Sequence, residues 1–579
     1  MTTPVPPAAS PLPVDGRAEA PRWRPSRITM TEHRSTRVTP RRGRVAVPAL
    51  GSGVGLALSL PPWGWWALAF PAAGLLWWRL GGLRPRTRLW AGWLAGLGLY
   101  VPGLMWARAF TLPGALVLMV VEAAFVAVAC LVVPAGPAVA RMLAFPAALT
   151  LAEAARMRWP FGGLPIGGVF LGQADGPVLG VARLGGPLGL TIAVYLGGAG
   201  LAALVAAAAK AVRDGARARE FARADPGGGG GGAGGAGGAG GGAPVGLVAG
   251  AVAGLGPLVA SGAVALVIVA LAAAAADHAP DGGASLGTVS AAAVQGGGAR
   301  GFSQSQIDPV VVLAAQLAET RLLARQDHGA VPALVLWPED VVSLDTALAD
   351  SPEQADLSAL ARSLRTTLVV GVTETVSTTA FRNEIVAFGP DGALVARFEK
   401  VHRVPFGEYV PYRGFFAHLG NLSAVPRDAI PGTGSGLLET PAAPLGAMVS
   451  YEVFYADRGR DAVRHGAQLL IVPTNTSSYA TAQVPTQEIA AAEIQAVQQG
   501  RDLIQAAPTG YSAAITNRGT LLQRSVLGAP QIVAATLSRR DGWTVYVRFG
   551  DELPLALAGL ALVVGWVVAG RRRRLERYS

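Results

Sequence analysis

The sequence is short of cysteine, histidine and charged residues, and each shortage excludes a class of site or protein. Its single cysteine, Cys130, stands in an apolar run, so the chain can form no internal disulfide and no site built on paired cysteines. Its six histidines are widely spaced, and the glycine-rich stretch 227–242 lacks the flanking strand and helix that a phosphate-binding loop needs. We therefore expect neither a metal ion nor another cofactor.

Charge is scarce because much of the chain is apolar. Charged residues make up 15% of the sequence and apolar residues 51%, whereas soluble domains carry about 25% charged residues. Eight apolar segments approach the roughly 20 residues that a helix needs to cross a bilayer. They cover residues 46–61, 63–79, 89–107, 112–134, 139–155, 181–209, 245–275 and 553–569. The sequence predicts an integral membrane protein with eight spans.

The basic residues are distributed unevenly along the chain. Segment 277–552 holds 20 Lys and Arg against 27 Asp and Glu, a net charge of −7, while the rest of the chain carries +18. Beside the predicted spans, 24 basic residues share the side of the two termini, and only four fall on the other side, namely Arg108, Arg156, Arg158 and Arg183. Because basic residues concentrate on the cytoplasmic side, we predict cytoplasmic termini and an extracytoplasmic 277–552. The acidity of that segment disfavours nucleic acid as a partner.

These patterns divide the chain into a membrane part and one external domain. We expect a disordered cytoplasmic tail at 1–45, a seven-helix region at 46–276 with a cytoplasmic glycine-rich loop at 210–244, an external domain at 277–552, an eighth span at 553–570 and a basic cytoplasmic tail at 571–579. Glu122 and Glu153 fall inside predicted spans. A carboxylate there is either functional or a neutral, hydrogen-bonded group at a helix interface.

The external segment alternates between strand and helix patterns. Strands are expected at 288–294, 333–337, 367–373, 384–388, 393–398, 446–449, 468–472, 503–506, 512–516 and 532–537, and helices at 309–326, 353–365, 457–465 and 484–501. This alternation predicts an α/β domain with two sheets and outer helices.

Three of these strands each lead into a residue that can do chemistry. The stretch Val335-Leu336-Trp337-Pro338 precedes Glu339, and a carboxylate beside an apolar strand end can have a raised pKa and act as a general base. Lys400 follows another strand, where its ammonium can stabilise an oxyanion. Ser450 stands between a strand and a helix, as the nucleophile does in a nucleophile elbow.

Taken together, the three stretches resemble the Glu-Lys-Cys triad of the nitrilase superfamily. The sequences W-P-E at 337–339, F-x-K-x-H-x-V-P-F-G-E-Y-V-P at 398–411 and Y-E at 451–452, combined with membrane spans, are similar to one branch of it, the apolipoprotein N-acyltransferases. The resemblance implies a nitrilase-like αββα sandwich on the outer face of a bacterial inner (cytoplasmic) membrane.

The resemblance also implies roles for individual residues. Glu339 would be the general base, Lys400 would stabilise the tetrahedral oxyanion, and Ser450 would stand at the nucleophile position. The supporting residues would be Glu408, Tyr451, Glu452, Asn383 and Asn475. The implied reaction moves an acyl chain from a membrane phospholipid to the nucleophile and then to the α-amine of a diacylglyceryl-cysteine lipoprotein, by a ping-pong route. The resemblance further implies a monomer.

This sequence departs from the family pattern at two places. Position 450 is Ser where the family has Cys, and a hydroxyl is far less acidic than a thiol, whose pKa is about 8.5. The stretch Thr476-Ser477-Ser478-Tyr479 also replaces an Asn-Asp-x-Trp-Phe type of loop. Three alternatives to an efficient acyltransferase therefore stay open: a weak or inactive paralogue that binds lipoproteins or lipids, a membrane-tethered amidase, and a Ser-His triad built on His402 or His465.

Overall fold

The computed structural model describes residues 43–224, 243–301, 307–325, 331–418, 422–423 and 425–578. The predicted N-terminal tail up to residue 42 lies outside these residues. So do the glycine-rich linker at 227–242 and Ser579.

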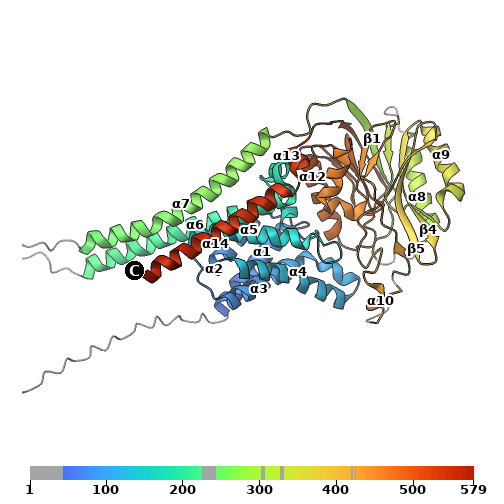
Figure 1. Ribbon diagram of the computed structural model, residues 1–579. Helices are drawn as coiled ribbons and strands as arrows, with labels where there is room; N and C mark the ends of the chain where they lie inside the picture. The colour runs from blue at the N-terminus through green and yellow to red at the C-terminus, as the bar shows by residue number, and fades with distance from the viewer. Residues whose placement is uncertain are drawn as a thin grey trace, which may run out of the picture. The chain divides into compact units, whose positions relative to one another are not determined.

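All eight apolar segments overlap observed helices (Figure 1). These helices are α1 (Gly43–Ser59), α2 (Ala69–Leu80), α3 (Pro85–Gly103), α4 (Leu112–Val132), α5 (Ala138–Arg156), α6 (Ala182–Ala224), α7 (Ala243–His278) and α14 (Glu552–Tyr578).

Judged by length and composition, fewer of the observed helices could cross a membrane than the sequence predicts. Within the described part of the chain, five stretches are long and apolar enough to cross a membrane, namely Leu112–Val132, Ala138–Arg156, Leu179–Arg217, Gly256–His278 and Glu552–Arg572. Helix α1 is apolar but has 17 residues. Helix α2 has 12 residues, about 18 Å at ~1.5 Å per residue, against a hydrocarbon core of about 30 Å. The structure thus supports five candidate spans, and the count of eight stays a prediction.

The segment after α7 folds around two β-sheets. The first has the order β14-β1-β2-β4-β5-β6, with β3 beside β4 and β7 beside β5, and the second has the order β13-β12-β11-β10-β9-β8. The strands of the first sheet are β1 (Thr288–Gln295), β2 (Leu334–Leu336), β3 (Val342–Leu344), β4 (Thr367–Ser377), β5 (Ala380–Phe388), β6 (Leu394–Glu399), β7 (Asp428–Ala429) and β14 (Gln531–Ser538). Those of the second are β8 (Leu437–Leu438), β9 (Leu445–Ala447), β10 (Leu469–Pro473), β11 (Leu503–Ala506), β12 (Ala513–Ile515) and β13 (Leu521–Arg524).

The two sheets pack face to face and helices cover their outer faces. Successive side chains of a strand point to opposite faces, and β1 follows this rule: Ala291 and Ala293 join the core between the sheets, which also holds Ile471, while Ala292 and Val294 join an outer core. That outer core includes residues of α8 (Pro309–Leu322) and α9 (Pro352–Leu364). Parallel pairing of β1 with β2 and of β2 with β4 brings their carboxyl ends to one edge.

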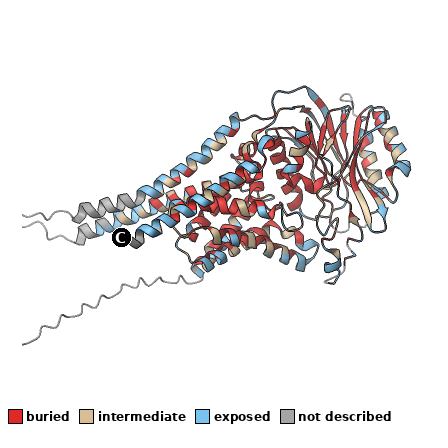
Figure 2. Cartoon of the chain, viewed as in Figure 1, coloured by how far each residue is buried: buried red, intermediate tan, exposed pale blue. Residues whose placement is uncertain are grey.

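The second sheet is covered by helices that also touch the membrane part. Its outer face, α11 (Ala456–Arg464) and α12 (Gln483–Gln499) belong to one hydrophobic core together with residues of the bundle helices (Figure 2). The side chain of Gln483 donates to the carbonyl oxygens of Pro102 and Gly103 at 2.7 and 3.1 Å. Helix α12 is therefore buried between the sheet and the bundle.

The sequence predicts most of this domain correctly. Each predicted strand overlaps an observed strand, and each predicted helix overlaps α8, α9, α11 or α12. The missed elements are short: β3, β7, β8, β13, α10 (Arg413–Phe416) and α13 (Val545–Phe549). The fold is the predicted α/β sandwich of two sheets with outer helices.

Candidate active site

Glu339, the predicted base, and Lys400, the predicted oxyanion-stabilising residue, follow two strands of the first sheet. Strand β2 ends at Leu336 and a tight turn follows, in which Glu339 is buried. Strand β6 ends at Glu399, so Lys400 is the first residue beyond it, and its N–H donates to the carbonyl oxygen of Asn383 on β5 at 2.9 Å. The sheet therefore fixes the backbone at the root of the lysine side chain.

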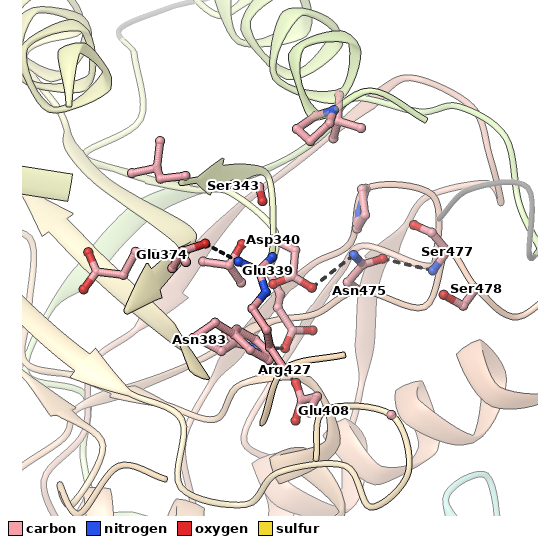
Figure 3. A pocket seen from close by; sticks show the side chains of 18 of the residues that line it. Glu339, Asp340, Ser343, Glu374, Asn383, Glu408, Arg427, Asn475, Ser477 and Ser478 are labelled. Atoms are coloured by element: carbon pink, nitrogen blue, oxygen red, sulfur yellow. Dashed lines mark hydrogen bonds between the residues drawn. The ribbon is translucent and has the colours of Figure 1, made fainter. Parts of the chain in front are cut away.

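A buried ion cluster forms around the Lys400 ammonium. Its Nζ lies 2.8 Å from Oε1 of Glu339 and 2.7 Å from Oε1 of Glu408. Lys400 is 1% exposed and Glu339 3% exposed, so solvent screens this pair little. Asn383 donates through Nδ2 to the same two oxygens at 2.8 and 3.0 Å. Four residues from three separate stretches of the sequence thus meet in one cluster, labelled in part in Figure 3.

The surroundings of the cluster set its protonation. Burial raises the pKa of the Glu339 carboxyl, and Lys400 opposes this shift. For Lys400, burial favours the neutral amine, but the adjacent Glu339 and Glu408 carboxylates outweigh burial and raise the pKa of the ammonium above its usual range. Lys400 therefore stays cationic at neutral pH, as an oxyanion ligand must, while Glu339 becomes a stronger base than a free carboxylate.

A glycine on the neighbouring strand allows Glu339 to approach the sheet. A Cβ on Gly371 of β4 would lie 2.3 Å from the carbonyl oxygen of Pro338 and 2.6 Å from Cα of Glu339. Any larger residue would push the turn away from β4 and with it the carboxylate from Lys400. Gly371 is consequently part of the machinery that places Glu339.

Ser450 lies in a strained turn after β9. Its φ is +51°, a left-handed conformation that non-glycine residues adopt rarely and that clusters at functional sites. The residue opens a short 3₁₀ helix, Ser450–Phe454, that leads into α11. The expected strand–nucleophile–helix order is therefore present, with this tight turn inserted.

Glu452 ties the Ser450 turn to the Lys400 loop. One oxygen of its carboxylate accepts from the N–H groups of Val401 and His402 at 2.8 and 2.9 Å, and the other accepts from the N–H of Val449 at 2.9 Å. The same carboxylate thus holds the residue after Lys400 and the residue before Ser450. Through this carboxylate, the backbone next to Lys400 lies close to the backbone next to Ser450.

The geometry does not support a Ser-His triad. His402 stacks on Tyr455 with ring centroids 4.1 Å apart, and its Nε2 faces Asp457 at 3.7 Å. His465 Nδ1 interacts with the carbonyl oxygen of Asp461 at 2.8 Å. Among the described residues no hydrogen bond joins either imidazole to Ser450, so the structure gives this alternative no support.

A cavity of about 430 Å³ opens beside the cluster (Figure 3). Glu339, Glu408, Asn383 and Asn475 contribute to its lining. Another lining residue, Asp340, was not predicted from the sequence. Its φ is +59°, and its Oδ2 lies 3.5 Å from Nδ2 of Asn475. Only its position directly after Glu339 could have signalled it.

Comparisons with known proteins identify the family of this chain. The model of the apolipoprotein N-acyltransferase N-terminal domain matches residues 52–200, and that of carbon-nitrogen hydrolases matches residues 290–542. The apolipoprotein N-acyltransferase of Mycolicibacterium smegmatis is 30% identical over 92% of this chain and 87% of its own length. The chain belongs to the apolipoprotein N-acyltransferase family. The enzyme of that name from Allorhizobium ampelinum is 27% identical over 86% of this chain and 90% of its own length.

Solved structures with related catalytic domains are more distant. Saccharomyces cerevisiae Nit3, of the nitrilase superfamily, is 22% identical over 43% of this chain and 90% of its own, with a TM-score of 0.33. An amidase from Nesterenkonia sp. is 19% identical over 46% of this chain and 94% of its own, also with a TM-score of 0.33.

Proposed function

We propose that this chain is a phospholipid-dependent N-acyltransferase that acylates the α-amine of the N-terminal diacylglyceryl-cysteine of bacterial lipoproteins. The observation that carries the proposal is the Lys400 ammonium held between Glu339 and Glu408 beside the Ser450 turn. Family membership over nearly the whole chain supports it, because both substrates are lipid-anchored and demand a membrane enzyme.

In the proposed first half-reaction, Ser450 is the nucleophile and Glu339 the general base. Ser450 Oγ attacks an ester carbonyl carbon of the phospholipid while Glu339 takes the hydroxyl proton. Lys400 stabilises the negative charge on the carbonyl oxygen. Collapse of the tetrahedral intermediate breaks the ester bond, Glu339 returns the proton to the leaving alkoxide, and a lysophospholipid departs. The acyl chain is then esterified to Ser450.

The second half-reaction repeats the steps with an amine. The neutral α-amine of the lipoprotein attacks the Ser450 ester, Glu339 accepts a proton from the nitrogen, and Lys400 again stabilises the oxyanion. Return of that proton to Ser450 Oγ releases the amide. An amine attacks an oxygen ester less readily than a thioester, and a hydroxyl is a weaker nucleophile than a thiolate. We therefore expect slow turnover relative to a cysteine enzyme.

The membrane placement is part of the proposal. We infer an inner-membrane protein that acts as a monomer, with cytoplasmic termini and the 277–552 domain on the outer face. The 24 to 4 split of basic residues beside the spans supports this orientation. The organisation into a 46–276 bundle, this domain and a 553–570 span is proposed on the same grounds.

Intact-mass analysis after incubation with phospholipid vesicles tests the function. We expect an added acyl mass on Ser450, faster acylation of Ser450→Cys, and none of Ser450→Ala. Ser363→Cys, which puts a thiol on the exposed face of α9, controls for nonspecific thiol acylation. Lipoprotein binding with no acylation of either the native protein or Ser450→Cys would instead identify an inactive paralogue. Hydrolysis of an amide substrate without any lipoprotein requirement would identify an amidase.

A further inference from the structure

The two carboxylates inside the predicted spans share one cation. Glu122 on α4 and Glu153 on α5 both face Arg156, the last residue of α5. The guanidinium makes a two-point contact with Glu153, at 2.8 and 2.7 Å, and lies 3.3 Å from Glu122. Arg156 is 1% exposed. Its side chain is therefore buried between two helices, which its place at the end of a predicted span did not indicate.

The same guanidinium also reaches the chain beyond α5. It donates to the carbonyl oxygens of Leu164, Pro165 and Ile166 at 2.5, 3.2 and 3.3 Å. Arginine presents five N–H donors in a rigid planar fork, which lysine cannot reproduce. Arg156 therefore fixes the segment 157–166, here called the α5 loop, against the α4–α5 pair.

The α5 loop accepts hydrogen bonds from two tyrosines of the catalytic domain that follow Ser450 in the sequence. The hydroxyls of Tyr451 and Tyr455 both donate to the carbonyl oxygen of Gly163, at 2.9 and 3.1 Å. Gly163 has a φ of +89°, and a Cβ there would lie 2.1 Å from the carbonyl carbon of Met157. The loop conformation that presents this carbonyl is thus restricted to glycine.

A third tyrosine makes a similar contact beside Glu408. The Tyr409 hydroxyl donates to the carbonyl oxygen of Phe161 at 3.1 Å. The α5 loop therefore contacts Tyr451, which follows Ser450, and Tyr409, which follows Glu408. A shift of this loop would move both at once.

We propose that Arg156 is a positioning residue for acyl transfer, acting through the α5 loop and Tyr451 and Tyr455 to hold the Ser450 turn. The inference rests on the proposed function. A misplacement of about 1 Å can cost ~100-fold in rate, so loosening the loop should slow acylation without preventing folding.

The test compares Arg156→Lys with Arg108→Lys in the Ser450→Cys protein, measuring acyl-enzyme formation by intact mass over a range of phospholipid concentrations. Arg108 is exposed and lies outside the α5 loop, so it controls for an arginine-to-lysine change in the same part of the chain. We expect Arg156→Lys to lower the maximal acylation rate about 10- to 100-fold, with a change of less than about threefold in the half-saturating phospholipid concentration. Arg108→Lys should acylate at the parent rate.

A double-mutant comparison separates positioning from general stability. Tyr455→Phe removes one hydroxyl from the far side of the loop and leaves α5 intact. If Arg156 acts through the loop, the losses from Arg156→Lys and Tyr455→Phe will be less than multiplicative. Multiplicative losses, or a parent rate in folded Arg156→Lys, would overturn the proposal. No acylation of the Ser450→Cys parent would overturn the proposed function, and this inference with it.

Discussion

Replacement of Glu452 by glutamine should damage the site more than any surface substitution. The carboxylate is fully buried and accepts three backbone N–H groups, from Val401, His402 and Val449. Glutamine is nearly isosteric, but one of its two oxygens becomes an NH₂ donor. The amide nitrogen must then face at least one of the N–H groups, so that a bond is lost and two donors oppose each other.

The size of the effect follows from the number of bonds. A hydrogen bond to a charged group contributes about 1.5–3 kcal/mol, and an unsatisfied buried donor costs about 1–3 kcal/mol. Glu452→Gln should therefore lower the free energy of unfolding by about 2–4 kcal/mol. Glu452→Ala would leave all three donors unpaired, up to about 9 kcal/mol, comparable with the entire 5–15 kcal/mol of a typical protein. Glutamine is the informative substitution because alanine should abolish folding.

Thermal unfolding in detergent and acyl-enzyme formation by intact mass are the two measurements. We expect a lower unfolding midpoint and, at a temperature where the variant is folded, slower acylation, since the bridge between the Lys400 loop and the Ser450 turn is broken. Glu399→Gln is the matched control, because that carboxylate lies at the end of β6, is 36% exposed and pairs with Arg382. A Glu452→Gln protein with the control's midpoint and acylation rate would refute the reasoning.

Two further predictions concern buried acids of the same domain. Burial raises the pKa of Glu488 to about 8. Between about pH 4.5 and 8 the folded protein therefore keeps a proton that the unfolded chain releases. The free energy of unfolding should fall across this range, by up to about 1.4 kcal/mol per pH unit. Glu488→Gln should flatten this slope in unfolding midpoints measured across that range, and an unchanged slope would contradict the assignment. Burial and the neighbouring Glu339 raise the pKa of Asp340. Asp340→Asn should raise the midpoint at pH 8 by about 2–4 °C and by less at lower pH, where the native carboxyl is protonated; a lower midpoint at pH 8 would contradict this.

The strand pattern and the spaced motif were enough to predict which residues meet around Lys400. Apolar runs identified the strands, and each chemical residue follows a strand end, so its place at the edge of a sheet could be inferred. The motif at 398–411 linked Lys400 to Glu408, and the pair is in contact. The position of a site residue can therefore be predicted from local sequence when the strand that precedes it sets that position.

Contacts set by long-range packing could not be predicted. Nothing near Arg156 in the sequence indicates that its guanidinium meets Glu122, 34 positions away, or that the loop after it supports Tyr455, almost 300 positions away. Counting basic residues uses only the position of an arginine beside a predicted span, so it gives no sign that the Arg156 side chain is buried and paired. The Asp340 turn was missed for a similar reason, because its left-handed backbone is imposed by the surrounding fold.

The burial of α12 has a consequence for anyone who wishes to study the two halves apart. A fragment beginning after α7 would expose the side of that helix that now lies against α6. Water would meet isoleucine, valine and alanine there, together with glutamine side chains deprived of their carbonyl acceptors. Such a fragment should self-associate or precipitate, so crystallisation and labelling are best designed for the undivided polypeptide in a lipid-like environment.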